Sequence, residues 1–132
     1  MKIHNLFFGL AALGLTATPA LADHHMAKAM KIGTATLKIL TNAKGMTLYT
    51  LATDKPGVSI CNGKCATLWP PMIATVKSKG EGDFSVIKRA DGKPQWAYKD
   101  MPLYTWIKDK KVGDVTGDGV KGKTGLWSVA RP

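Results

Sequence analysis

The stretch LYTWIKDK at residues 103–110 decides the fold, because a close copy of it, LYTLATDK, stands at residues 48–55. The two copies share Leu, Tyr, Thr, Asp and Lys at matching positions. A Leu-Trp pair follows each copy at a similar spacing, as Leu68-Trp69 and as Leu126-Trp127. A repeated sequence indicates a repeated structural unit whose copies bury their apolar faces together. The sequence therefore predicts one domain built from two degenerate repeats.

The segments around the two copies are typical of short strands separated by turns. Apolar and β-branched residues gather in each segment, and Gly, Asn, Asp and Pro gather between them. The connections are too short for crossover helices, and no segment shows a sustained helical period, so the strands should be antiparallel. The predicted fold class is therefore mainly β, a small antiparallel domain. The expected strands are 34–40, 46–51, 84–89, 95–98, 103–107 and 126–130.

The repeated residues form the motif Tyr-x-(Phe/Trp/Tyr)-x-x-Asp. The second copy fits it in full, through Tyr104, Trp106 and Asp109. The first copy fits at Tyr49 and Asp54 and has Leu at the aromatic position. Further motifs accompany the copies: the run CNGKCATLWPP at 61–71, Arg-x-Asp-Gly at 89–92 and Pro-Leu-Tyr at 102–104.

On these residues the chain resembles the secreted-repeat family, also called predicted lipoproteins with the Tyr-x-(Phe/Trp/Tyr)-x-x-Asp motif. The resemblance covers residues 45–130. It implies an exported bacterial protein with the repeat fold, and it implies no particular activity. This chain has no lipid-attachment cysteine after its N-terminal apolar run, so membrane anchoring is not implied.

Residues 1–22 have the pattern of a secretory signal peptide. A basic start precedes an apolar run from Leu6 to Ala17, and the small residues of Ala20-Leu21-Ala22 form a cleavage site. The run is shorter than the roughly 20 residues needed to cross a bilayer. We expect a periplasmic or secreted protein without a transmembrane segment in its mature chain. The expected parts are a flexible tail over residues 23–33 and a single β-rich domain over 34–132.

Cleavage after Ala22 would leave Asp23, His24 and His25 at the new N-terminus. A histidine at the third position of a free chain end can close a square of nitrogen ligands with the amine and two backbone amides. Square-planar nitrogen ligation suits Cu(II). The sequence therefore predicts a Cu(II) site at these residues. The alternative is a polar tail whose histidines bind nothing.

Cys61 and Cys65 are the two cysteines of the chain. In an oxidising compartment a disulfide between them is the default. Residues four apart on a regular helix have Cβ atoms about 5–6 Å apart, whereas a disulfide needs about 3.5–4.5 Å. We therefore expect CNGKC to form a turn. A redox-active pair is the alternative, although the spacing is not Cys-x-x-Cys.

Each repeated Asp falls where its predicted strand ends. A carboxylate there can accept backbone N–H groups of the following turn. This predicts a structural role for Asp54 and Asp109, and a catalytic carboxylate pair is the alternative. Four aromatic residues could share one sheet face and offer a flat ligand a platform, or could form the core, depending on strand register. They are Trp96, Tyr98, Tyr104 and Trp106.

The chain carries a net charge of +10. Such a charge steers a protein toward anionic surfaces and polymers of the bacterial envelope. His24 and His25 would be the only histidines after cleavage, so the folded domain could build no Ser-His or Cys-His pairing. We therefore expect a non-enzymatic binding or structural domain that does not bind nucleic acid. A thiol-disulfide redox protein and a module for anionic envelope polymers are the alternatives.

Overall fold

The structure is a computed structural model and describes residues 26–32, 35–75 and 77–132. These residues form eight strands and one short helix. In chain order the elements are β1 (Met26–Ile32), β2 (Ala35–Thr41), β3 (Tyr49–Leu51), α1 (Lys64–Leu68), β4 (Phe84–Lys88), β5 (Pro94–Tyr98), β6 (Met101–Pro102), β7 (Lys121–Gly122) and β8 (Gly125–Val129).

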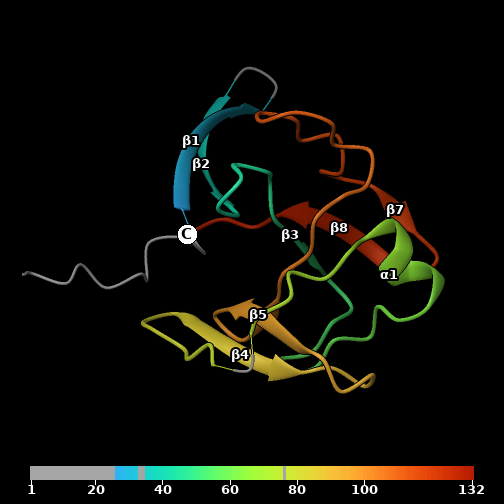
Figure 1. Cartoon of the computed structure of the whole chain (residues 1–132). Helices are drawn as coiled ribbons and strands as arrows, with labels where there is room; N and C mark the ends of the chain where they lie inside the picture. Colours follow the sequence, from blue (N-terminus) through green and yellow to red (C-terminus); the bar gives the residue numbers. More distant parts are fainter. Residues whose placement is uncertain (1–25, 33–34, 76) are drawn as a thin grey trace, which may run out of the picture.

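The strands form three small sheets in the orders β1-β2, β3-β8-β7 and β4-β5-β6. Every pairing between these strands is antiparallel. In Figure 1, the β1–β2 and β4–β5 pairs lie at opposite ends, and β3 and β8 lie between them. The mainly antiparallel β fold predicted from the sequence is confirmed.

The two repeats meet at Tyr49 and Tyr104. Each of these residues donates its backbone N–H to the other's carbonyl, at 2.8 and 3.0 Å. On its outer side, Tyr49 pairs with Val129 in β8, and Tyr104 pairs with Pro71. Val129 and Pro71 each stand two positions after a tryptophan of a Leu-Trp pair. The repeats therefore lie antiparallel, with equivalent neighbours on the two sides.

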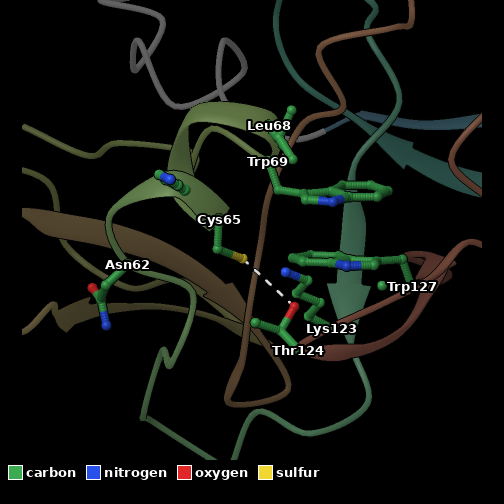
Figure 2. Close-up of a pocket in the computed structure, with 9 residues that line it drawn as sticks. Asn62, Cys65, Leu68, Trp69, Lys123, Thr124 and Trp127 are labelled. Atoms are coloured by element: carbon green, nitrogen blue, oxygen red, sulfur yellow. Dashed lines mark hydrogen bonds between the residues drawn. The ribbon is translucent and has the colours of Figure 1, made fainter.

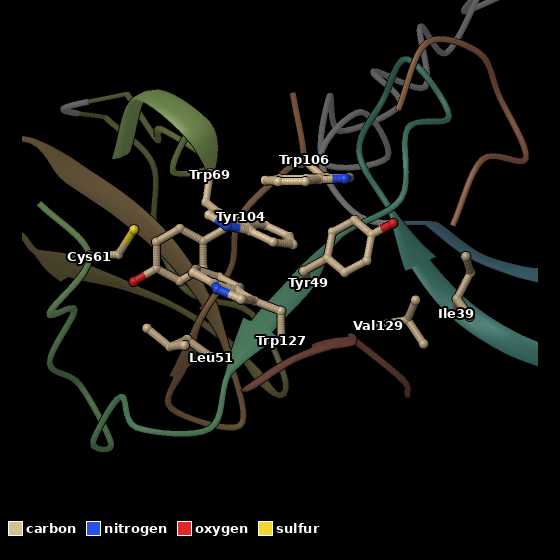
Figure 3. Close-up of a cluster of buried hydrophobic side chains, with 9 residues drawn as sticks. All are labelled: Ile39, Tyr49, Leu51, Cys61, Trp69, Tyr104, Trp106, Trp127 and Val129. Atoms are coloured by element: carbon tan, nitrogen blue, oxygen red, sulfur yellow. The ribbon is translucent and has the colours of Figure 1, made fainter. Parts of the chain in front are cut away.

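The central strands are buried on both faces, because neighbouring residues of a strand point in opposite directions. The tyrosines belong to one core cluster, and the preceding residues, Leu48 and Leu103, belong to another. The first cluster, drawn in Figure 3, contains Ile39, Tyr49, Leu51, Cys61, Trp69, Tyr104, Trp106, Trp127 and Val129. The second contains Leu40, Leu48, Ala74, Trp96, Leu103 and Ala130.

The N-terminal part of the domain differs from the flexible tail expected over residues 23–33. Met26–Ile32 form β1, which pairs antiparallel with β2 along its whole length, from Met26 opposite Thr41 to Ile32 opposite Ala35. Backbone pairing with a β-rich neighbour gives this segment partners that the sequence pattern alone did not suggest. Residues 23–25 and 33 lie outside the described residues.

The strand expected at 103–107 is wrong in its extent. Only its first residues remain extended, with Tyr104 in bridges to Tyr49 and Pro71. The chain then turns, and the N–H of Asp109 donates to the carbonyl of Trp106 at 3.1 Å. The turn brings Asp109 back toward the core, where it receives a hydrogen bond from the other repeat.

The hairpin between β5 and β6 has a two-residue turn at Lys99 and Asp100. Both residues have positive φ angles, 46° and 66°, as a tight hairpin turn requires. Tyr98 therefore lies opposite Met101, and Ala97 lies opposite Pro102. This register overturns the shared aromatic face considered above, since Trp96 belongs to one core cluster while Tyr104 and Trp106 belong to the other.

Candidate functional site

The repeated tyrosines and aspartates are paired across the repeats. The Tyr49 hydroxyl donates to Asp109 Oδ2 at 2.6 Å, and the Tyr104 hydroxyl donates to Asp54 Oδ2 at 2.7 Å. All four residues are buried. The sequence placed each Tyr and Asp within one motif, but in the folded domain each motif completes the other.

The second oxygen of each carboxylate accepts hydrogen bonds from the turn that follows the aspartate in the chain. Asp54 Oδ1 accepts the N–H of Ile60 at 2.8 Å. Asp109 Oδ1 accepts the N–H of Thr116 at 3.0 Å and its hydroxyl at 2.6 Å. These contacts agree with the local role expected from the sequence. Both oxygens of each carboxylate therefore have hydrogen-bond partners within the domain.

Burial governs the protonation of these groups. Burial raises the pKa of the Tyr49 hydroxyl far above its ordinary value, and the hydrogen bond to Asp109 raises it further. Burial likewise raises the pKa of the Tyr104 hydroxyl. The pKa of Asp54 is also raised by burial, against the lowering effect of the Ile60 N–H and the Tyr104 hydroxyl. The two tyrosines therefore stay protonated and act as donors.

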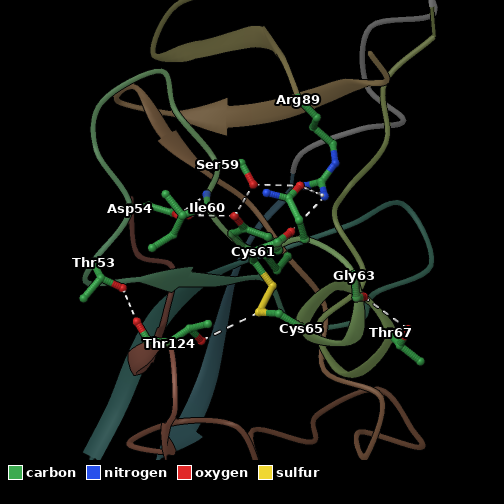
Figure 4. Close-up of a disulfide and its surroundings, with 12 residues drawn as sticks. Thr53, Asp54, Ser59, Ile60, Cys61, Gly63, Cys65, Thr67, Arg89 and Thr124 are labelled. Carbon is green, nitrogen blue, oxygen red and sulfur yellow. Dashed lines mark hydrogen bonds between the residues drawn. A yellow bond between two sulfur atoms is a disulfide. The ribbon is translucent and has the colours of Figure 1, made fainter. Parts of the chain in front are cut away.

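Arg89 is a buried cation, and in the sequence it stands out only as the first residue of the Arg-x-Asp-Gly motif. Its guanidinium donates to Ser59 Oγ at 2.9 Å and to the carbonyl of Cys61 at 2.8 Å (Figure 4). It also donates to Gln95 Oε1 at 2.9 Å and to Asn62 Oδ1 at 3.2 Å. Its side chain is 1% exposed. Arg89 therefore fixes the backbone and side chains of the loop that carries the disulfide.

Cys61 and Cys65 form the expected disulfide, with an S–S distance of 2.04 Å and a Cα–Cα distance of 5.2 Å. Gly63, with a φ of 59°, turns the chain between them, and α1 begins directly afterwards. Cys61 is completely buried, whereas Cys65 is partly exposed and lies 3.7 Å from the Thr124 hydroxyl, between the Sγ and Oγ1 atoms. The bond thus ties α1 to the core.

Beside the disulfide is a pocket of about 500 Å³ between α1 and the turn that joins β7 to β8 (Figure 2). Thr53 supports the far wall, because its hydroxyl donates to the carbonyl of Thr124. The pocket is lined by Asn62, Lys64, Cys65, Leu68, Trp69, Gly122, Lys123, Thr124 and Trp127. The lining contains the two tryptophans of the repeated Leu-Trp pairs, so the pocket lies where the two repeats meet.

Three tryptophans form a stack at the pocket. The rings of Trp69 and Trp127 are 3.9 Å apart and nearly parallel, at 6°. Trp106 stacks on Trp69 at 3.9 Å and 24°. Tyr49 meets Trp69 edge-on at 5.4 Å, and Tyr104 meets Trp127 edge-on at 5.0 Å. The hydrogen-bonded tyrosines therefore hold the indoles in place, and the pocket has rigid aromatic residues in its lining.

The copper ligands expected at Asp23, His24 and His25 lie outside the described residues. Within the described part of the chain, no group of three or more His, Cys, Asp or Glu side chains is placed to hold a metal ion. Among the same residues, no helix has the length and apolar character needed to cross a membrane.

Comparison with known proteins identifies the family of this chain. No curated protein and no solved structure matches the chain. A family model described as a secreted repeat of unknown function matches residues 34–72 and again residues 85–131. The first match contains Tyr49 and Trp69, and the second contains Tyr104 and Trp127, so the family unit coincides with each half of the structure. The chain therefore belongs to the family described as a secreted repeat of unknown function.

Proposed function

We propose that this protein is a non-enzymatic binding domain of the bacterial envelope, and that it takes a flat apolar molecule into the pocket between α1 and the β7–β8 turn. The observation that carries the proposal is the pocket itself, whose lining includes the stacked Trp69 and Trp127. Ligand pockets in proteins are typically apolar hollows of 300–1,000 Å³ with a few polar groups at fixed positions. The size and lining here fit that description.

The walls of the pocket are held independently of any ligand. The disulfide and Arg89 fix the loop of Cys61 and Asn62 on one side, and Thr53 supports Thr124 on the other. A preformed site loses little conformational entropy on binding, which favours affinity for a small molecule. This rigidity supports binding as the function of the pocket.

The chemistry of the lining supports binding rather than catalysis. Asp54 and Asp109 are engaged by tyrosine hydroxyls and turn N–H groups, and neither lines the pocket. Thiol-disulfide exchange has weaker support, because Cys61 is completely buried, its carbonyl is held by Arg89, and only Cys65 is partly exposed. Reactive cysteines are generally accessible. The Cu(II) site predicted at Asp23, His24 and His25 is a separate proposal, since it depends on the chain end and not on the pocket.

The test is a binding titration with the neutral dye N-phenyl-1-naphthylamine, whose fluorescence rises in apolar surroundings. A Cβ at Gly122 would meet no atom within 4 Å. Gly122→Leu should therefore fill the pocket without disturbing the fold. Lys79→Leu is the matched control, because Lys79 is exposed and does not line the pocket.

We expect saturable binding to the wild type and to Lys79→Leu, and affinity at least about tenfold lower in Gly122→Leu. Absence of saturable binding to the wild type would overturn the proposal. Equal affinity in the wild type and in Gly122→Leu would overturn it as well, since the dye would then bind elsewhere.

A further inference from the structure

We infer that the ligand of this pocket is an anion, a flat apolar body that carries a sulfonate, carboxylate or phosphate group held between Lys64 and Lys123. The inference rests on the proposed function, because it assigns the chemical class of the molecule that the same pocket binds. Charged and hydrogen-bonding groups at the rim of the pocket favour an anion.

The two lysines stand on opposite walls of the pocket. Lys64 is the first residue of α1, and Lys123 lies in the turn between β7 and β8. Figure 2 shows Lys123 and Thr124 across the pocket from α1. Among the described residues neither lysine forms an ion pair, and no Asp or Glu lines the pocket. The pocket lining therefore carries two cations and no acidic side chain, and an anion bound there would offset their charge.

Asn62 adds a neutral donor to the same rim. A guanidinium has donors and no acceptor, so the Asn62 atom that faces Arg89 at 3.2 Å is its oxygen. The amide nitrogen of Asn62 must then point away from Arg89. This nitrogen belongs to an exposed residue of the pocket lining. Arg89 thus leaves the amide nitrogen of Asn62 available as a donor, and a charged oxygen accepts from such donors more strongly than a neutral one.

The apolar part of the ligand would contact Leu68 and the small exposed part of Trp69, since Trp127 is completely buried. Leu68 is 47% exposed, and it borders the pocket together with Trp69. Covering this side chain would remove apolar surface from water. The lysines at the rim would therefore bind the anionic group of the ligand, and the apolar lining would bind its ring system.

The experiment compares two dyes that differ in one charged group. The anionic dye is 8-anilinonaphthalene-1-sulfonate, and the neutral dye is N-phenyl-1-naphthylamine, which has the same ring system without the sulfonate. Each is titrated into the wild type, into the double variant Lys64→Glu/Lys123→Glu and into the control Lys77→Glu/Lys79→Glu. The control changes the net charge equally, at exposed lysines that do not line the pocket.

We expect the wild type to bind the anionic dye about tenfold more tightly than the neutral dye, as two exposed charge contacts allow. Lys64→Glu/Lys123→Glu should lose this preference and keep its affinity for the neutral dye. Lys77→Glu/Lys79→Glu should keep both affinities. Added salt should weaken only the binding of the anionic dye.

The other outcomes separate the two proposals. Equal affinity of the wild type for both dyes overturns the anionic ligand and leaves the binding function in place. An equal loss of preference in both double variants also overturns it, because the attraction would then come from the net charge of the surface. If neither dye binds the wild type, both proposals fail.

Discussion

Tyr49 donates its hydroxyl to Asp109 at 2.6 Å, across a separation of 60 residues. Tyr104 and Asp54 repeat the contact in the opposite direction. Neither repeat satisfies all of its buried groups alone, because Oδ2 of each carboxylate accepts from the tyrosine of the other repeat. An unsatisfied buried polar group costs more than a hydrogen bond contributes. The two repeats are therefore expected to unfold together, in one cooperative transition.

Breaking either hydrogen-bonded pair, Tyr49–Asp109 or Tyr104–Asp54, should lower the free energy of unfolding. Tyr49→Phe and Tyr104→Phe each remove the donor from a buried carboxylate, and each should lower the free energy of unfolding by about 1–3 kcal/mol. Urea denaturation followed by circular dichroism measures the change. Tyr98→Phe is the control, since Tyr98 belongs to neither pair and is only half-buried. An equal loss in the control would contradict the role given to the pairs.

The domain should lose stability in alkali because of the same tyrosines. Their pKa values are raised in the folded state above the ordinary value of 10.0, so the unfolded chain releases these protons first. As pH rises above about 10, the unfolded state binds fewer protons than the folded state, and stability falls by about 1.4 kcal/mol per pH unit for each tyrosine.

This loss is measured from urea unfolding at a series of pH values between about 9 and 11. Tyr49→Phe should show a shallower decline than the wild type, because one of the two groups no longer titrates. Lysines titrate in the same range in both proteins, so the difference between the two curves isolates the tyrosine. Parallel curves would show that Tyr49 has no raised pKa.

Arg89 should matter for both stability and binding. Arg89→Met leaves Ser59, Gln95 and the carbonyl of Cys61 without their buried donor, and we expect a loss of about 2–4 kcal/mol in the free energy of unfolding. Asn62 also loses the contact that orients it, so affinity for an anionic dye should fall. Lys88→Met, at the exposed neighbouring position, should change neither quantity. A stable Arg89→Met variant would contradict this assignment.

The disulfide should behave as a structural bond. Cys61 is completely buried, so we expect a reduction potential below about −300 mV, measured in defined ratios of thiol and disulfide. Replacement of both cysteines by serine should cost about 2 kcal/mol, as a short closed loop predicts. A potential near that of periplasmic oxidants would instead favour the redox alternative.

The copper prediction needs protein whose N-terminus is confirmed by mass as Asp23. Titration with Cu(II) should then give a one-to-one visible band typical of square-planar nitrogen ligation. His25→Ala should abolish the band, and His24→Ala should retain it, because only the third position completes the square. Absence of the band from protein that begins at Asp23 would reject the site.

The repeated sequence predicts the strands and the two repeats, but not the hydrogen bonds and strand register that join them. The shared residues at 48–55 and 103–110 identified two copies, and turn residues identified most strands. The crossing of Tyr49 to Asp109 was not predictable from the spacing, because a local motif does not say which copy supplies a partner. The register of β5 and β6 depended on the turn at Lys99 and Asp100, and one residue of shift moves every side chain to the other face.

The sequence also does not predict the pocket. Trp69 and Trp127 were recognised as equivalent residues, which is the signal that could have placed them together. Lys64 and Lys123 gave no signal, since they resemble the other dispersed surface lysines of a basic chain. The anion site proposed for them depends on α1 lying opposite the turn after β7. Long-range placement of this kind comes from tertiary packing and has no local sequence pattern.

The reciprocal backbone hydrogen bonds between Tyr49 and Tyr104 relate the two repeats as two subunits of a dimer are related. Equivalent residues of the two halves donate to each other's carbonyls, and each half has the same neighbours, as two subunits have in a symmetric dimer. A chain with a single repeat would carry one tyrosine and one aspartate, and could satisfy them only against a second copy of itself. The domain therefore has the architecture of a homodimer contained within one chain. The two copies are not identical, and only the first carries the disulfide, whose Cys65 borders the pocket.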